Sequence, residues 1–468
     1  MKAEEFITKH REDMIADIKA FAAIPSILDE ETMAPGRPFG EKAADALSWV
    51  LEKGKSLGMD VKNFDGYAGE MTVGTGGRLI GILGHADVVA PGEGWDTEPF
   101  EIQEIDGKLY GRGTMDDKGP IVSCLYAVKY LMEENLIPKD TAIRFIVGCD
   151  EEEEWRCIEH YGAKADRMPD CAIVPDGNFP LIHCEKGLMD VDFSYAVHGK
   201  ADCKITVEAL HGGAAKNVVP GKAYCNLRCP DAETAAALAA ALNAFEQVSA
   251  TQEESGVSVI VSGKSTHAMS PEKGLNAISQ LMQTLGEVGK TFDIEPVYRT
   301  YNQYIGMHYY GENFGLQFED AASGKLTFNV GTIELKDGKL VFGVSVRYPA
   351  TVEKEKIFAA AEETCRQAGM EMHVTSHMNG LYVDADSDFI GVLMEAYQKV
   401  SGDCESRPMA IGGATYARTI PNAVAFGPLF PYEEELAHEA NEYLDLDSLD
   451  KMTLIYIEAL KGLLAMEA

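Results

Sequence analysis

The sequence predicts an α/β protein whose mostly parallel sheet, flanked by helices, is interrupted by an inserted α+β domain. Apolar, β-branched runs alternate with amphipathic helical segments at both ends of the chain. Between these ends the pattern changes to the period-two alternation that is typical of half-exposed antiparallel strands. We therefore expect residues 1–187 and 383–468 to form one domain and residues 188–382 to form another, in keeping with a length of 468 residues.

Helical spacing of apolar residues and buried apolar runs predict the elements of the first domain. The helices are expected at residues 3–24, 40–58, 118–135, 386–400 and 446–465, with a short one after Glu153. The strands are expected at residues 79–89, 141–150, 171–177 and 423–427.

The inserted segment predicts two strand–helix–strand halves. Its strands are expected within residues 188–209 and at 256–266, 325–336, 338–349 and 370–377. Its helices are expected at residues 232–247, 273–288 and 353–368. The pair Asp337-Gly338 lies between two of the strands and is a strong hairpin signal.

Composition excludes several classes of partner. The chain has 41 Lys+Arg against 75 Asp+Glu, a net charge of -34, which disfavours nucleic acid and anionic membranes. No run approaches the ~18 apolar residues of a spanning helix, and the N-terminus lacks the apolar stretch of a signal peptide. The ten cysteines include no CxxC pair and suit buried thiols in a reducing cytoplasm. Cys225 and Cys229 fit a metal pair or, on one face of a strand, packing residues.

Acidic and imidazole side chains follow the predicted buried strands of the first domain. In chain order they are His85-Ala86-Asp87, Asp116-Asp117, Asp150-Glu151-Glu152, Asp176 and, in LAHEANE, His438. The carboxyl ends of strands in an α/β sheet are where an active site is expected. Any one of these groups alone is more often a solvated turn or a helix N-terminus, but the whole set is hard to explain by solvation.

The residue types predict a metal centre. Carboxylate oxygens mixed with imidazole suit Zn²⁺, Mn²⁺ or Co²⁺ better than Mg²⁺ or Ca²⁺. Because no cysteine belongs to the set, a structural zinc site is disfavoured. Two ions need a bridging carboxylate, which one of the paired aspartates could supply, and a remaining glutamate could act as a general base.

These motifs resemble a family of di-zinc metallopeptidases. The family includes PepV-type dipeptidases, carnosinases, aminoacylases, carboxypeptidase G and succinyl-diaminopimelate desuccinylase. The matching segments, in the family's order, are GHADVVAPGEGWDTEPF, YGRGTMDDKGP, DEEEEW, VPDG and the late His438. The resemblance implies two divalent ions, Zn²⁺ first, with Mn²⁺ or Co²⁺ as alternatives.

The resemblance also assigns ligands to the two ions. His85 and Asp176 would hold one ion, and Glu152 and His438 would hold the other. Asp116 would bridge them, through a cis peptide bond to Asp117.

Two further residues take supporting roles in the same resemblance. Asp87 would orient His85, and Glu151 would be the general base. The inserted domain would be a lid.

Within the lid, SGKSTHAMSPEKGLNA resembles the segment whose histidine, here His267, steadies the oxyanion of the scissile carbonyl. Asn217 and Arg347 resemble lid residues that bind substrate, and a guanidinium suits a free carboxylate.

A glycine-rich loop completes the expected substrate site. GGATYAR resembles the loop that takes the substrate carboxylate on backbone N–H groups. The residues of that loop are Gly412, Gly413, Ala414 and Thr415, and Ala414 stands where PepV-type enzymes usually have a third glycine.

A lid of this size with two halves resembles the PepV type, in which a monomer delivers the lid histidine in cis. The expectation is a cytoplasmic metal-dependent dipeptidase that hydrolyses small unblocked dipeptides with a water activated between two ions. One alternative is a deacylase or desuccinylase acting on N-acyl amino acids with the same centre. Another is a non-catalytic binding protein of the same fold.

Overall fold

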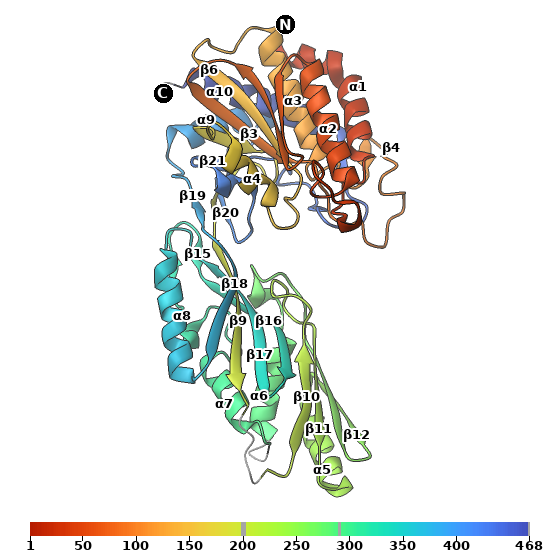
Figure 1. Ribbon diagram of the computed structural model, residues 1–468, viewed down its shortest axis with the longest axis vertical. Helices are drawn as coiled ribbons and strands as arrows, with labels where there is room; N and C mark the ends of the chain where they lie inside the picture. Colours follow the sequence, from red (N-terminus) through yellow and green to blue (C-terminus); the bar gives the residue numbers. More distant parts are fainter. Residues whose placement is uncertain (198–202, 289–291, 467–468) are drawn as a thin grey trace. The chain divides into compact units, whose positions relative to one another are not determined.

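The computed structural model describes residues 1–197, 203–288 and 292–466, which fold into two compact units (Figure 1). Unit 1 consists of Met1–His183, Val383–Met409 and Ala414–Ala468, and unit 2 of Cys184–Tyr382 and Ala410–Gly413. Unit 1 is thus built from both ends of the chain. The role of unit 2 as a lid stays a prediction.

A nine-stranded sheet, most of whose strands belong to unit 1, forms the centre of that unit. In spatial order its main path is β1 (Asp60–Phe64), β2 (Ala68–Gly74), β6 (Thr141–Gly148), β3 (Arg78–His85), β7 (Cys171–Val174), β21 (Ala423–Ala425), β8 (Ile182–Glu185) and β19 (Leu381–Tyr382), with β20 (Met409–Ile411) paired to β8. The α/β class is confirmed. The sheet is mixed: along its main path the four central strands from β6 to β21 pair in parallel, whereas β1 with β2, β2 with β6, β21 with β8 and β8 with β19 pair antiparallel.

Helices cover both faces of this sheet. They are α1 (Ala3–Ala22), α2 (Glu41–Ser56), α3 (Lys118–Glu133), α4 (Arg156–Lys164), α9 (Asp388–Ser401) and α10 (Leu446–Ala465). On one face α2 packs closely on Met71 of β2 and α3 packs on Gly84 of β3. On the other face Tyr161 of α4 lies 3.5 Å from the Arg144 guanidinium of β6. The core strands are apolar because both of their faces are buried in this way.

A small three-stranded sheet lies at the rim of unit 1. Its order is β22 (Tyr443–Asp445), β5 (Lys108–Tyr110) and β4 (Gln103–Ile105). The pairing of β22 with β5 joins the late part of the chain to the segment that leads into Asp116.

Unit 2 is organised around an eight-stranded antiparallel sheet. Its order is β12 (Val248–Glu253), β13 (Gly256–Ser262), β11 (Lys222–Arg228), β10 (Thr206–Gly212), β16 (Thr327–Lys336), β17 (Lys339–Tyr348), β9 (Gly187–Ala196) and β18 (Glu371–Met378). Its helices are α5 (Ala232–Leu242), α6 (Ala277–Val288), α7 (Glu295–Tyr304) and α8 (Lys354–Ala368). Inward-facing residues of these strands and helices form one hydrophobic core.

The predicted hairpin is present in unit 2. Lys336 pairs with Lys339, and Asp337 and Gly338 have φ angles of 50° and 72°. Positive φ at both central residues is the requirement of the turn that Asp-Gly favours. Cys225 and Cys229 are both buried, and Cys225 lies within β11, so they are packing residues.

Several boundaries in unit 2 differ from the sequence prediction. The helix expected at 232–247 ends at Leu242, where Asn243 caps it and the chain enters β12. The helix expected at 273–288 begins only at Ala277, because Pro271–Lys273 forms a separate 3-10 turn. Helix α7 was not predicted. Part of the segment 188–209, residues 198–202, lies outside the described residues.

No helix among the described residues combines the length and the apolar character of a membrane span.

A pair of glycine substitutions tests the packing of α2 on the sheet. A Cβ at Gly54 would lie 2.2 Å from the sulfur of buried Met71, whereas at Gly391 in α9 nothing lies within 4 Å. Alanine gains helix propensity at both sites, by about 1 kcal/mol, but overpacking costs roughly 1–3 kcal/mol. Gly54→Ala should therefore lower the free energy of unfolding in urea and Gly391→Ala should raise it. An increase in both variants would contradict this packing.

Candidate metal centre

The central parallel strands bring the predicted ligands to one edge of the sheet. His85 is the last residue of β3 and lies in register with Gly148 at the end of β6. Glu151 and Glu152 follow β6 directly, and Asp176 follows the neighbouring strand β7. The carboxyl ends of adjacent parallel strands meet at one edge, so residues far apart in the sequence become neighbours.

Two histidines and three carboxylates form a continuous cluster within unit 1. His85 Nε2 lies 2.9 Å from Asp116 Oδ1 and 3.8 Å from Asp176 Oδ2. His438 Nε2 lies 2.9 Å from Glu152 Oε2 and 3.2 Å from Asp116 Oδ2. The two pairs of residues expected to hold separate ions thus lie on either side of Asp116.

Asp116 presents one carboxylate oxygen to each histidine. This arrangement suits a carboxylate that bridges two ions. The peptide bond between Asp116 and Asp117 is cis, as the resemblance implied. Asp117 belongs to neither group of candidate ligands and is fully buried, where its carboxylate accepts the backbone N–H of His85 at 3.2 Å. It therefore supports β3 rather than joining the ligands.

Asp87 fixes the orientation of the His85 ring. His85 Nδ1 lies 3.0 Å from the Asp87 carbonyl and 3.5 Å from its carboxylate. With Nδ1–H donating to the Asp87 carbonyl, Nε2 is the nitrogen left to bind an ion. The other Asp87 oxygen accepts the backbone N–H of Glu152 at 3.1 Å, which ties the loop after β6 to the same residue.

Burial and crowding of like charges shift the pKa values of the cluster. Burial raises the pKa of Asp176 to about 7, and the charge of Asp116 adds to the shift. Burial pushes the pKa of Asp116 upward as well, but hydrogen bonds from His438 and His85 outweigh it and hold the pKa below its ordinary value. Hydrogen bonds to Asp116 and Glu152 raise the pKa of His438 to about 11.

Glu151 lies inside the cluster but outside its hydrogen-bonded pairs. One of its carboxylate oxygens lies within 4.8 Å of ligand atoms of His85 and Asp176. Burial, followed by the charge of Asp176, raises the pKa of Glu151 well above its ordinary value. The geometry places it close enough to share a water molecule with the ligands, and also close enough to act as a ligand itself.

The donor set fits divalent cations. Two groups, His85–Asp116–Glu152 and His85–Glu151–Asp176, each offer ligand atoms within 4.8 Å of one another. Partly buried carboxylates at this density repel one another unless protons or a cation lie among them, and the raised pKa values of Glu151 and Asp176 reflect that repulsion together with burial. Ion binding would displace those protons.

His267 and Asn217, two of the residues predicted to contact the substrate, lie close together within unit 2. The backbone N–H of Ala268 donates to the carbonyl of Asn217 at 2.8 Å, so His267 and Asn217 lie on neighbouring segments. Buried Asn329 holds this turn, donating to the carbonyls of Lys216 at 2.8 Å and Val218 at 3.0 Å.

Arg347, at the end of β17, is close enough to His267 to influence its charge. Partial desolvation of the ring, followed by the charge of Arg347, lowers the pKa of His267, so the imidazole is neutral at neutral pH. Its Nδ1 accepts the backbone N–H of Met269 at 3.2 Å. The proton therefore resides on Nε2, which is free to donate to an oxyanion.

The expected carboxylate loop divides between the two units. Gly412 belongs to unit 2, where its carbonyl accepts Arg347 Nη1 at 3.3 Å and a Cβ would lie 2.7 Å from Met269 Cβ. Ala414 and Thr415 belong to unit 1, and the Thr415 hydroxyl caps the 3-10 turn Tyr416–Thr419. None of residues 412–414 has a positive φ, so alanine at 414 is unstrained.

Other residues near the centre are structural or were missed by the sequence analysis. Asp150, which begins the acidic run, is buried and bound to the Arg156 guanidinium at 2.7 Å. Glu442 and Arg112 form a fully buried ion pair beside Asp116, although neither was predicted to matter. One sequence feature could have drawn attention to Glu442, since it lies in the motif LAHEANE together with His438.

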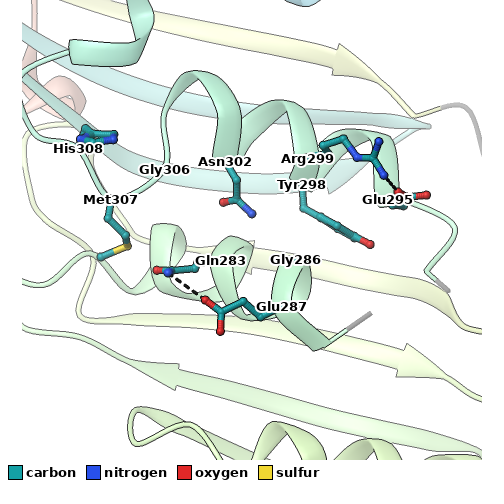
Figure 2. Close-up of a pocket in the computed structure, with 10 residues that line it drawn as sticks. All are labelled: Gln283, Gly286, Glu287, Glu295, Tyr298, Arg299, Asn302, Gly306, Met307 and His308. Carbon is teal, nitrogen blue, oxygen red and sulfur yellow. Dashed lines mark hydrogen bonds and ion pairs between the residues drawn. The ribbon is translucent and has the colours of Figure 1, made fainter. Parts of the chain in front are cut away.

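A separate pocket lies between α6 and α7 in unit 2 and has a volume of about 500 Å³ (Figure 2). Its lining includes Gln283, Glu287 and Asn302, and Gln283 donates to Glu287 at 3.1 Å. None of the predicted catalytic or ligand residues lines it, so the candidate site is the cluster in unit 1.

The comparison with known families matches the chain over residues 81–462 to the model described as Peptidase family M20/M25/M40. The chain belongs to this peptidase family. The match includes every predicted metal ligand from His85 to His438, and the resemblance drawn from the motifs is confirmed.

Similar proteins extend over nearly the whole chain. "Putative dipeptidase YtjP" of Bacillus subtilis is 34% identical, and the alignment covers 98% of this chain and 99% of that protein. A relative of the same description in Staphylococcus saprophyticus is 32% identical over 97% of each. Among solved structures, human carnosine dipeptidase 1 has a TM-score of 0.57 at 15% identity and covers 99% of this chain and 98% of its own. The aminoacylhistidine dipeptidase of Vibrio alginolyticus has a TM-score of 0.59 at 16% identity, over 97% of each chain.

The family membership makes this chain a hydrolase of the metallopeptidase type, and it implies divalent metal ions. The solved structures share its fold.

Ion binding should stabilise the fold measurably. At an ion concentration of 100 times Kd, the free energy of unfolding in urea should rise by about 2.7 kcal/mol per site, and a chelator should remove the gain. His438→Ala should reduce this gain, because it removes an exposed ligand without opening the core. His211→Ala, an exposed histidine of unit 2, is the matched control and should keep it. If neither the ion nor the chelator changes the free energy of unfolding, the metal centre is contradicted.

Proposed function

We propose that the protein is a metal-dependent dipeptidase that hydrolyses unblocked dipeptides. The observation that carries the proposal is the carboxylate and imidazole cluster, with Glu151 beside it and Asp116 between two histidines. Two relatives at 34% and 32% identity, each named "Putative dipeptidase", support the substrate class.

In this proposal His85 and Asp176 hold one divalent ion, and Glu152 and His438 hold the other. Asp116 is the shared ligand. The ions, most simply Zn²⁺ with Mn²⁺ or Co²⁺ as alternatives for the same donors, supply the Lewis acidity that lowers the pKa of a water molecule.

Glu151 would move the proton in the reaction. Its carboxylate takes a proton from the attacking water as the water oxygen bonds to the peptide carbonyl carbon. It then gives that proton to the amine nitrogen as the C–N bond breaks. Asp87 keeps the His85 ring in the orientation that leaves Nε2 for the ion.

Unit 2 would supply the groups that recognise the substrate. We propose that His267, neutral and protonated on Nε2, donates a hydrogen bond to the developing oxyanion. Arg347, with Asn217 and the loop Gly412, Gly413, Ala414 and Thr415, would hold the C-terminal carboxylate. Closure of a lid in cis on a cytoplasmic monomer, without nucleic acid or membrane, belongs to the same proposal.

A substrate panel separates this function from deacylation. The chain, loaded with Zn²⁺ or Mn²⁺, should hydrolyse unblocked dipeptides and leave their N-acetyl and N-succinyl counterparts largely intact. The measurement is kcat/KM for each substrate. Turnover confined to N-acyl amino acids would favour the deacylase or desuccinylase, and no turnover of either class would favour a binding protein.

Removal of the proposed base should separate chemistry from ion binding. Glu151→Ala should lower kcat by at least about 100-fold, the scale of general base catalysis, while two ions remain bound. Glu153→Ala, an exposed glutamate two residues away, is the matched control and should keep normal turnover. Metal content by atomic emission and kcat on the same preparation give the result. Normal turnover in Glu151→Ala, or loss of ions along with activity, would remove Glu151 from this role.

A further inference from the structure

A buried ion pair, Arg112 with Glu442, lies beside the candidate ligand Asp116, and the sequence motifs did not reveal this pairing. Arg112 Nη1 and Glu442 Oε2 lie 2.7 Å apart, with 1% and 0% of their side chains exposed. Moving both charges out of water is costly, and a hydrophobic pair in such a position is often as stable. The pair therefore calls for an explanation beyond the stability of the fold.

The second oxygen of Glu442 holds the backbone around the proposed bridging ligand. Glu442 Oε1 accepts the N–H of Met115 at 2.8 Å and that of Asp116 at 3.2 Å. One carboxylate thus joins the Arg112 side chain to the peptide group of Asp116 itself. A shift of Glu442 would move the backbone from which the Asp116 carboxylate projects.

The same residue anchors the segment that carries His438. The Gly111 N–H donates to the Glu442 carbonyl at 2.9 Å, and Tyr443 pairs with Tyr110 where β22 meets β5. Four residues before Glu442, His438 Nε2 lies 3.2 Å from Asp116 Oδ2. Residues 111–116 and residues 438–443 are therefore joined at two places, by the Arg112–Glu442 pair and by the contact between Asp116 and His438.

Arg112 is itself fixed from two sides. Its backbone N–H donates to the Pro99 carbonyl at 2.9 Å, and its guanidinium lies over the Trp95 ring with 5.4 Å to the centroid. Next to Trp95 in the chain, Asp96 donates its backbone N–H to the Asn441 side chain at 2.8 Å. The guanidinium is thus a rigid support for the Glu442 carboxylate.

We propose that Arg112 and Glu442 are positioning residues that set the spacing between Asp116 and His438 and so determine the affinity for the ion at that side. The proposal rests on the proposed metal centre. The pair does not touch an ion in this account. It acts through the backbone of Asp116 and the loop that carries His438.

We call the Arg112–Glu442 pair the clamp. The test compares ion binding in two variants of it. Glu442→Gln removes the charge that faces Arg112, and the double variant Arg112→Met with Glu442→Leu removes both charges, so no unpaired charge stays buried. Calorimetric titration of the chelator-treated full-length chain with Zn²⁺ and Mn²⁺ gives stoichiometry and affinity. In both variants one ion should bind roughly 10- to 100-fold more weakly, the usual effect of losing a residue that orients a ligand.

A second buried pair in unit 1 provides the matched control. Glu70 and Arg144 lie 3.4 Å apart with 11% and 9% of their side chains exposed, on strands β2 and β6. Glu70→Gln should destabilise the fold and leave both ion affinities unchanged. If Glu442→Gln does not fold, the charge-free double variant decides the question.

The possible results separate the clamp from the proposed function. A wild-type chain that binds no divalent ion contradicts the metal centre, and the clamp with it. If the wild-type chain binds two ions and the clamp variants bind them equally tightly, the clamp alone is contradicted. The same holds if the clamp variants lose no more affinity than Glu70→Gln.

Discussion

The structure of the candidate site depends on one electrostatic constraint, which is that four carboxylates lie at one edge of a sheet with little access to water. Asp116, Glu151, Glu152 and Asp176 cannot all be ionised at this spacing unless positive charge lies among them. Burial and the charge of Asp116 accordingly raise the pKa of Asp176 to about 7, and hydrogen bonds to Asp116 and Glu152 raise the pKa of His438 to about 11. Divalent cations would meet the same need with a fixed geometry.

The residues around the ligands explain how such a cluster persists. Asp87 links the His85 ring to the Glu152 backbone, and the Asp117 carboxylate accepts the backbone N–H of His85. The Arg112–Glu442 pair then joins the Asp116 turn to the segment that carries His438. His85, Asp116 and the backbone of Glu152 are therefore held by polar contacts that do not depend on an ion. This rigidity lets the fold keep like charges close together.

Much of the fold was predictable because strong periodicity leaves few choices. The central strands β3, β6 and β7 are continuous apolar runs, and the hairpin at Asp337-Gly338 has an unambiguous turn signal. Helix α7 is short and was not predicted because its buried face, Val297, Tyr298 and Tyr301, consists mostly of tyrosines, whose hydroxyl groups weaken the apolar pattern in the sequence. The ligands could be named because each directly follows a strand or belongs to a motif. The partnership of Arg112 with Glu442 could not, since it depends on the pairing of β22 with β5.

The central claim is that the cluster holds two ions with Asp116 between them. The most direct measurement is anomalous diffraction from crystals of the full-length chain grown with Zn²⁺ or Mn²⁺. The account predicts two anomalous peaks at this edge of the sheet, one beside His85 and Asp176 and one beside His438 and Glu152, with Asp116 in contact with both. A single peak, or two peaks that Asp116 does not join, would contradict it.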